Sequence, residues 1–157
     1  MTKSITIEAE RKYEVVLVDD WATELLNSAR GRRVVLLVPE KLASFVPTKL
    51  PGAELIVLPE GEAQKSISTF AEVLEKLADL LITRSDLIVG IGGGATTDLA
   101  GFVAATYLRG IEWIAVPTSV AGALDASIGG KTGVNTPFAK NMVGSFYQPD
   151  GVLIDPL

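Results

Sequence analysis

The sequence predicts a doubly wound α/β fold, that is, a largely parallel sheet with helices on both faces. Branched apolar runs of strand length alternate with segments whose apolar residues recur every three or four positions. The helix pattern "DDWATELLNSAR", for example, is followed by a Gly31 stop and then by the strand pattern "RVVLLVP". Alternation of this kind favours parallel strands joined by helical crossovers. The two opening strand patterns, "SITIEA" and "YEVVLVD", predict an N-terminal β-hairpin instead.

The remaining elements follow in the same order. "EKLASFVPTKL" predicts a short helix and "AELIVLP" a buried strand. The clearest helix spans about 66–82, and its apolar face consists of Ile67, Phe70, Val73, Leu74, Leu77, Leu80 and Leu81. Next come the strand "DLIVGI", a turn "GGG", the helix "ATTDLAGFVAATYLRG" and the strand "EWIAVP". The stretch "DASIGGKTGVNTPFAKN", residues 125–141, is too rich in glycine for a helix and too polar for a core strand. The last strand, "GVLIDP", has no closing helix, which suggests a domain boundary or a truncation.

Composition narrows the possible chemistry. A chain of 157 residues with 48% hydrophobic content fits one domain, 1–157, and its apolar fraction raises the chance of a homodimer or a missing neighbouring domain. The absence of cysteine and histidine excludes thiolate chemistry and removes the commonest metal ligand and general base. A net charge of -5 argues against nucleic acid as a partner. No run is long and apolar enough to span a membrane and no secretion signal is recognisable, so we expect a cytoplasmic protein.

A glycine-rich turn between a strand and a helix is the first candidate binding element. In "VGIGGGATTDLAG", residues 92–94 are glycines, which let backbone N–H groups approach a phosphate at the positive end of a helix. Thr96 or Thr97 could cap that helix or bond a phosphate oxygen. The turn is neither the G-x-G-x-x-G fingerprint nor a P-loop, so by itself it could equally be a tight connection.

Several polar residues follow other predicted strands. Glu62 and Lys65 in "PEGEAQKS" could be a capped, solvated helix start, and Thr118 and Ser119 follow the strand "EWIAVP". In a doubly wound sheet, however, the carboxyl ends of the strands converge on the ligand crevice. We therefore expect these residues and the glycine turn to lie together.

Four motifs carry a resemblance to a known family. "EGEAQKS", "GIGGGATTDLAGFVAATYLRG", "VPTSVAGALDASIGGKTGVN" and "KNMVGSFYQP" closely resemble the N-terminal, NAD-binding domain of 3-dehydroquinate synthase, in the sugar phosphate cyclase superfamily. The resemblance covers about 60–156, and "GGKTGVN" followed by "KNMVGSF" is its most specific part. It implies a Rossmann-like fold and an NAD-dependent lyase of the shikimate pathway, in chorismate and aromatic amino acid biosynthesis. That enzyme converts 3-deoxy-D-arabino-heptulosonate 7-phosphate into 3-dehydroquinate and phosphate.

The resemblance also implies roles for individual residues. Substrate contacts fall on Asp125, Lys131 and Asn141, and Arg109 resembles an arginine that reaches the substrate phosphate from a neighbouring subunit. Without the resemblance these would be a turn cap, solvated loop charges and a helix C-terminal charge. The implied NAD contacts are Glu62, Lys65, Gly93, Gly94, Ala95, Thr96, Thr97, Asp98, Thr118, Ser119, Lys131 and Lys140.

The sequence also departs from the family pattern. Where the family often has an aspartate that binds the adenosine ribose, "LVPEK" offers Glu40 after Pro39. The family's divalent metal, zinc or cobalt, is held by a glutamate and two histidines of a C-terminal helical domain, which this sequence does not include. We therefore expect the isolated chain to be inactive. Two other classes stay open: a glycerol dehydrogenase or iron-type alcohol dehydrogenase, and a non-enzymatic nucleotide-binding module.

Overall fold

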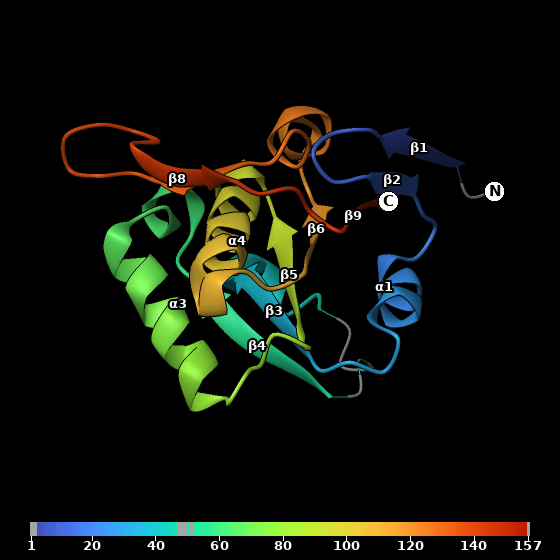
Figure 1. Cartoon of the computed structure of the whole chain (residues 1–157), viewed down its shortest axis with the longest axis horizontal. Coiled ribbons are helices and arrows are strands. Elements are labelled where there is room, and N and C mark those ends of the chain that lie inside the picture. Colours follow the sequence, from blue (N-terminus) through green and yellow to red (C-terminus); the bar gives the residue numbers. More distant parts are fainter. Residues whose placement is uncertain (1–2, 47–49, 51, 157) are drawn as a thin grey trace.

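The computed structural model describes residues 3–46, 50 and 52–156. Its main element is a seven-stranded sheet with the strand order β1-β2-β9-β6-β5-β3-β4, and a second sheet pairs β7 with β8 (Figure 1). The strands are β1 (Lys3–Ile7), β2 (Tyr13–Leu17), β3 (Val34–Pro39), β4 (Ala53–Leu58), β5 (Leu87–Gly92), β6 (Trp113–Pro117), β7 (Lys131–Val134), β8 (Val143–Phe146) and β9 (Gly151–Ile154). The helices are α1 (Trp21–Ala29), α2 (Glu40–Ala43), α3 (Ile67–Asp79) and α4 (Gly94–Thr106), with shorter turns η1 (Gly61–Gln64), η2 (Tyr107–Arg109) and η3 (Gly122–Ala126).

The pairing of the strands confirms the predicted fold class. β1 and β2 form an antiparallel hairpin, whereas β2 with β9 and all the remaining pairs of the large sheet are parallel. Pro39 lies opposite Leu58, and Gly92 lies opposite Pro117. Because these are the last residues of β3, β4, β5 and β6, the carboxyl ends of the four strands lie along one edge of the sheet.

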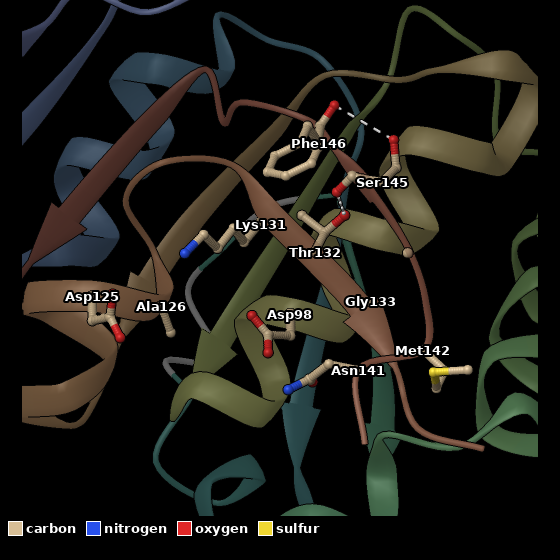
Figure 2. A pocket seen from close by; sticks show the side chains of 11 residues that line it. Asp98, Asp125, Ala126, Lys131, Thr132, Gly133, Asn141, Met142, Ser145 and Phe146 are labelled. Atoms are coloured by element: carbon tan, nitrogen blue, oxygen red, sulfur yellow. Dashed lines mark hydrogen bonds between the residues drawn. The ribbon is translucent and has the colours of Figure 1, made fainter. Parts of the chain in front are cut away.

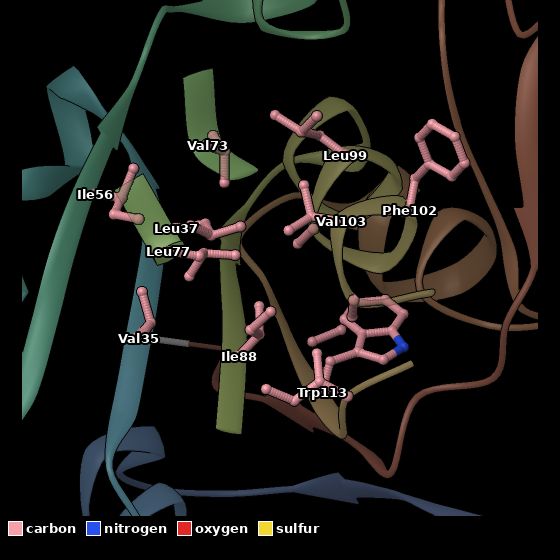
Figure 3. Packing of buried hydrophobic residues seen from close by; sticks show 14 of the residues in the cluster. Val35, Leu37, Ile56, Val73, Leu77, Ile88, Leu99, Phe102, Val103 and Trp113 are labelled. Atoms are coloured by element: carbon pink, nitrogen blue, oxygen red, sulfur yellow. The ribbon is translucent and has the colours of Figure 1, made fainter. Parts of the chain in front are cut away.

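Helices cover both faces of the sheet, as predicted. On one face, α3 and α4 pack against the strands through buried side chains that include Val73, Leu77, Leu99 and Val103 (Figure 3). On the other face, Leu25 of α1 packs in a second cluster with side chains of β3, β5, β6 and β9. Figure 1 shows α1 on the opposite side of the sheet from α3 and α4. Burial of these apolar faces is the main force that holds the layers together.

Local signals fix where the helices begin. The Asp20 carboxylate accepts a hydrogen bond from the Ala22 N–H at 3.1 Å, which caps α1. The Ser66 hydroxyl accepts one from the Thr69 N–H at 3.1 Å, which caps α3. The predicted apolar face of α3 is wrong at both ends, since Ile67 is exposed and Leu81 lies beyond the helix with a positive φ.

Two predicted helices are shorter in the structure. The pattern over 40–50 gives only α2, which ends at Ala43, and residues 47–49 of that prediction lie outside the described residues. Pro47 disfavours helical conformation in the residue before it, which limits extension of α2. The helix expected over 95–110 ends at Thr106, because Leu108, Arg109 and Gly110 all have positive φ.

The stretch 125–141 is not the simple polar loop that its composition suggests. It begins within η3 and contains β7, whose residues Thr132, Gly133 and Val134 are buried. β7 pairs antiparallel with β8, with Thr132 opposite Ser145. Gly101 of α4 has no side chain where Thr132 of β7 packs against it, so β7 lies close against α4 and is buried despite its polar neighbours.

Candidate functional site

The glycine turn joins the end of β5 to the start of α4 at the carboxyl edge of the sheet. Gly93 occupies the N-cap position of α4, and no side chain caps the helix. The expectation that Thr96 or Thr97 caps it is therefore wrong. Both threonines are fully buried; Thr96 donates its hydroxyl proton to Gln64 Oε1 at 2.9 Å, and Thr97 donates to the Gly94 carbonyl at 3.1 Å. What the turn offers a ligand is backbone N–H groups at a helix N-terminus rather than these hydroxyls.

Thr118 and Ser119 flank this turn from the end of β6. The Thr118 N–H donates to the Gly92 carbonyl at 2.8 Å, which ties the two strand ends together. The Ser119 hydroxyl oxygen accepts from the Gly122 N–H at 3.1 Å and lies next to Gly93, where a Cβ would be 3.6 Å away. Both residues are exposed at this edge of the sheet.

Lys65 is the centre of a polar network behind the same edge. Its side chain is only 5% exposed, and its ammonium group donates to Asp98 Oδ2 at 2.7 Å and to Asn141 Oδ1 at 2.6 Å. Glu62 Oε1 is farther away, at 4.0 Å from Lys65 Nζ. Burial raises the pKa of Asp98 above its ordinary value, and Lys65 partly offsets that rise. The charges of Glu62 and Asp125 add to the rise because they repel the ionised carboxylate.

A cleft of about 500 Å³ opens beside this network. Four predicted site residues line it: Asp98 from α4, Asp125 from η3, Lys131 from β7 and Asn141 from the loop before β8. Figure 2 shows the Lys131 side chain extending from β7 on the side of Asp125, with Asp98 and Asn141 next to each other. The other lining residues are Ala126, Thr132, Gly133, Met142, Gly144, Ser145 and Phe146.

The charges in the cleft differ in how they are balanced. Lys65 is paired with Asp98, whereas Lys131 is exposed and makes no ion pair with any residue that the structure describes. An unpaired cation beside carboxylate and amide groups suits a ligand that carries both an anionic group and hydroxyl groups. Among residues 3–46, 50 and 52–156, no group of three or more Asp or Glu side chains is placed to hold a metal ion.

Most of the predicted cofactor contacts are also outside the cleft lining and lie at the glycine turn, at the end of β6 or around Lys65. Arg109, Lys140 and Glu40 lie apart from all of these groups. Arg109 is exposed just beyond the C-terminal end of α4, whereas the glycine turn lies at the N-terminal end of that helix. Lys140 is exposed on the loop between β7 and β8. Glu40 is the first residue of α2 and is also exposed. Its neighbour Lys41 donates its N–H to Glu60 Oε1 at 2.6 Å, so Glu60 rather than Glu40 links α2 to the segment after β4.

Sequence reasoning missed several members of the network. Gln64 bonds to Thr96, and Asn135 bonds to Glu62, yet neither was singled out. Asn135 lies within the quoted motif "GGKTGVN", so the motif marked its neighbourhood without indicating its contacts. Met142 and Phe146 add exposed apolar surface to the cleft.

No helix in the described part of the chain has the length and apolarity that a bilayer span requires.

Solved structures with this fold include synthases and a probable dehydrogenase. One is 2-deoxy-scyllo-inosose synthase complexed with carbaglucose-6-phosphate, NAD+ and Co2+, with 27% identity, a TM-score of 0.87, and coverage of 99% of this chain and 45% of that one. Another is the 2-epi-5-epi-valiolone synthase ValA from Streptomyces hygroscopicus subsp. jinggangensis 5008, with NAD+ and Zn2+ bound, at 28% identity, a TM-score of 0.82 and coverage of 97% and 45%. A probable glycerol dehydrogenase from Sinorhizobium meliloti 1021 has 20% identity and a TM-score of 0.71 over 90% of this chain and 38% of that one, so it shares the fold alone.

Sequence comparison is more specific. 3-Dehydroquinate synthase from Streptococcus pneumoniae (strain Hungary19A-6) is 50% identical over 87% of this chain. The chain spans 40% of the length of that relative. The family model described as 3-dehydroquinate synthase N-terminal matches residues 55–157, which include η1, the glycine turn and the whole lining of the cleft. The chain therefore belongs to the 3-dehydroquinate synthase family, and the matched residues correspond to the N-terminal part of that family.

Proposed function

We propose that this chain is the NAD-binding half of a 3-dehydroquinate synthase. In this role it contributes to the conversion of 3-deoxy-D-arabino-heptulosonate 7-phosphate into 3-dehydroquinate and phosphate, a carbon–oxygen lyase reaction of the shikimate pathway. The observation that carries the proposal is the convergence of Asp98, Asp125, Lys131 and Asn141 on one cleft beside the glycine turn of α4. Membership of the family supports the choice of this reaction.

The residues present fit a dinucleotide. Gly93 and Gly94 leave the backbone at the start of α4 without side chains, and the exposed residue Ser119 lies next to Gly93. A pyrophosphate at this position would accept from backbone N–H groups and gain from the helix dipole. When bound, NAD would supply the hydride acceptor and donor for an alcohol of the substrate. Lys131, which lacks an ion-pair partner among the described residues, would attract the phosphate group, while Asp125 and Asn141 would bond substrate hydroxyls.

The divalent metal does not fit this chain in the same way. The described residues contain no cluster of three or more carboxylates for a metal ion, and the sequence has no histidine or cysteine. We propose, from the family resemblance, that the metal ligands come from a C-terminal domain of the full-length enzyme. A homodimer in which Arg109 reaches the partner's substrate phosphate belongs to the same proposal, and the exposure of Arg109 beyond α4 is compatible with it.

Two measurements on the purified chain test the assignment. Calorimetry should detect weak NAD binding, because the chain spans only 40% of the length of its Streptococcus pneumoniae relative and, in this proposal, the rest of that length completes the cleft; sub-micromolar affinity would count against the proposal. The chain supplied with NAD and the heptulosonate phosphate should release no phosphate. Detectable phosphate release would show that the isolated chain is active, which contradicts the prediction.

A chimaera provides the positive test. The chain replaces the corresponding part of the Streptococcus pneumoniae enzyme, and 3-dehydroquinate formation is measured. Lys131→Ala in the chimaera should lower activity by about 100-fold, as expected when a group that stabilises developing charge is removed. Lys76→Ala, on the exposed face of α3, is the matched control and should leave activity unchanged. Equal activity of the two variants would remove Lys131 from the proposed site.

A further inference from the structure

Asn135, the residue that follows β7, joins three segments of the candidate site. Its backbone N–H donates to the Lys65 carbonyl at 2.8 Å, and its side-chain N–H donates to Glu62 Oε1 at 2.7 Å. Its side-chain oxygen accepts from the Asn141 N–H at 2.8 Å. A single side chain thus connects η1 with the loop that precedes β8. A donor and an acceptor are both needed, which an amide provides and a carboxylate or hydrocarbon does not.

The contact with Asn141 holds an unusual backbone conformation. Asn141 has a φ of 55°, in the left-handed region that is uncommon outside glycine and that asparagine tolerates better than most residues. With its N–H held by Asn135, Asn141 directs its side-chain oxygen to Lys65 Nζ at 2.6 Å. The orientation of a residue that lines the cleft therefore depends on a residue that does not line it.

The contact of Asn135 with Glu62 controls the orientation of the Glu62 side chain. The same Oε1 atom that accepts from Asn135 at 2.7 Å stands 4.0 Å from Lys65 Nζ, too far for a hydrogen bond. Glu62 is half exposed and would be free to turn toward the ammonium group if Asn135 did not hold it. Asn135 thus keeps Glu62 directed away from Lys65 and leaves Lys65 to Asp98 and Asn141.

We propose that Asn135 is a positioning residue of the nicotinamide-cofactor site: it orients Glu62 and fixes the left-handed backbone of Asn141, without itself touching the ligand. The inference rests on the proposed function, because these orientations affect ligand binding only if the cleft beside α4 is the cofactor and substrate site. The effect of Asn135 on the loop, however, exists without any ligand. The effect on the loop and the effect on ligand binding can therefore be tested separately.

Proteolysis measures the effect on the loop in the unliganded chain. Lys140 is exposed on the loop that Asn135 holds through Asn141, and trypsin cleaves after lysine. Asn135→Ala removes both side-chain hydrogen bonds and should raise the cleavage rate after Lys140 about fivefold, as expected for the loss of a hydrogen bond that keeps the loop closed. Asn27→Asp, on the exposed face of α1, is the control and should cleave at the wild-type rate. Equal rates for Asn135→Ala and wild type would overturn the inference.

The dependence of NAD affinity on pH distinguishes positioning from general support of the fold. Asn135→Asp keeps an acceptor for Asn141 but lacks the donor to Glu62 unless its new carboxyl group is protonated. The charged groups around this position are Glu62, Lys65 and Asp98, and Glu62 would raise the pKa of the introduced acid by repulsion. Calorimetry should therefore show Asn135→Asp binding NAD about tenfold more weakly than wild type at pH 8, with the ratio approaching one near pH 5.

Each outcome decides a separate point. Wild type measured at each pH accounts for the groups whose titration the substitutions leave unchanged, and Asn135→Ala, which introduces no titrating group, should still bind NAD more weakly than wild type near pH 5. An affinity for NAD that is unchanged by both substitutions would overturn the positioning role. If the wild-type chain binds no NAD, the proposed function fails, and the proteolysis result still decides whether Asn135 holds the loop. Circular dichroism verifies that each variant is folded.

Discussion

Lys65 and Asp98 form an ion pair beneath the candidate cleft, with Lys65 Nζ 2.7 Å from Asp98 Oδ2. The lysine side chain is 5% exposed and the aspartate side chain 22%. The residues come from different elements, one at the end of η1 and the other in the second turn of α4. The pair therefore fixes the start of α4, and with it the glycine turn, against the segment that follows β4. Charges buried this far depend on each other, because water can replace the lost partner only in part.

The first prediction concerns removal of the cation. Lys65→Met keeps most of the side-chain volume but leaves Asp98 without its ion-pair partner and Asn141 without its hydrogen-bond donor. We expect the free energy of unfolding at pH 7 to fall by about 3 kcal/mol. Urea denaturation followed by circular dichroism measures it. Lys76→Met on the exposed face of α3 is the control. A loss for Lys65→Met no larger than that of the control would show that the pair does not contribute to stability.

The second prediction concerns pH and Asp150. Burial raises the pKa of Asp150 above its ordinary value, although the hydrogen bond from the Trp113 N–H and the charge of Arg11 lower it in part. Between the ordinary and the raised pKa, the folded chain retains a proton that the unfolded chain has lost. The folded state then binds more protons, so stability falls as pH rises through this window and stays lower above it.

Asp150→Asn should remove this contribution. The amide oxygen can still accept from the Trp113 N–H, but the group no longer titrates. Urea denaturation from mildly acid to neutral pH should therefore give a flatter stability profile for Asp150→Asn than for wild type. Asp79→Asn, at the exposed end of α3, provides the comparison and should keep the wild-type profile. The remaining slope of Asp150→Asn should reflect at least Asp98, whose pKa is also raised by burial, and Asp20, whose pKa is lowered by the hydrogen bond from Thr23. Parallel profiles for wild type and Asp150→Asn would contradict the prediction.

Much of the fold was predictable because its signals are local. The spacing of Phe70, Val73 and Leu77 by three and four residues predicted the buried face of α3. The glycines after β5 predicted the turn into α4. Exposed Leu81 carries the same apolar signal as these buried residues, so hydrophobicity alone could not show where the helix ends. The burial of β7 was also not predictable from its own residues, since it depends on the close approach of Thr132 to Gly101 of α4 rather than on an apolar pattern in the strand.

The site was predictable in its location but not in its internal contacts. The rule that strand ends converge placed Lys65 near the glycine turn, and the structure brings Lys65 to Asp98 on α4. The hydrogen bond from Lys65 to Asn141 joins residues 76 positions apart, and the one from Asn135 to Glu62 joins residues 73 apart. No periodicity encodes such pairs. They follow from how η1 and the loop before β8 approach each other once the sheet has formed.

The third prediction tests the buried hydroxyl of Thr96. It donates to Gln64 Oε1 at 2.9 Å, while Gln64 donates its own N–H to the Gly61 carbonyl at 2.9 Å. Thr96→Val preserves the shape but leaves the Gln64 oxygen without this donor in a buried position. We expect a loss of about 1–2 kcal/mol in the free energy of unfolding. Thr96→Ser, which retains the hydroxyl, should lose less. Equal losses for the two substitutions would show that packing of the methyl group matters more than the hydrogen bond.

The fourth prediction concerns the contact between α4 and β7. A Cβ at Gly101 would collide with the Thr132 methyl group and lie 2.8 Å from Trp113 Cζ2, so α4 and β7 approach this closely only because residue 101 has no side chain. Gly101→Ala should stabilise the helix by about 1 kcal/mol through its higher helix propensity. Overpacking costs about 1–3 kcal/mol. Because the new Cβ would collide with two neighbours, we expect the cost of overpacking to exceed the gain in propensity. We therefore expect net destabilisation in urea denaturation and a displaced β7.

Rescue in a double variant tests the cause of that loss. Thr132→Ser removes the methyl group that the new Cβ would meet, yet keeps a hydroxyl able to donate to the Ser145 carbonyl, as Thr132 does at 2.7 Å. Gly101→Ala with Thr132→Ser should thus be more stable than Gly101→Ala alone, even though Thr132→Ser by itself removes a buried methyl group. Because β7 carries Lys131 into the cleft, recovery of stability should accompany recovery of the wild-type position of Lys131 in a crystal structure. Additive losses in the double variant would show that the collision with Thr132 is not the cause.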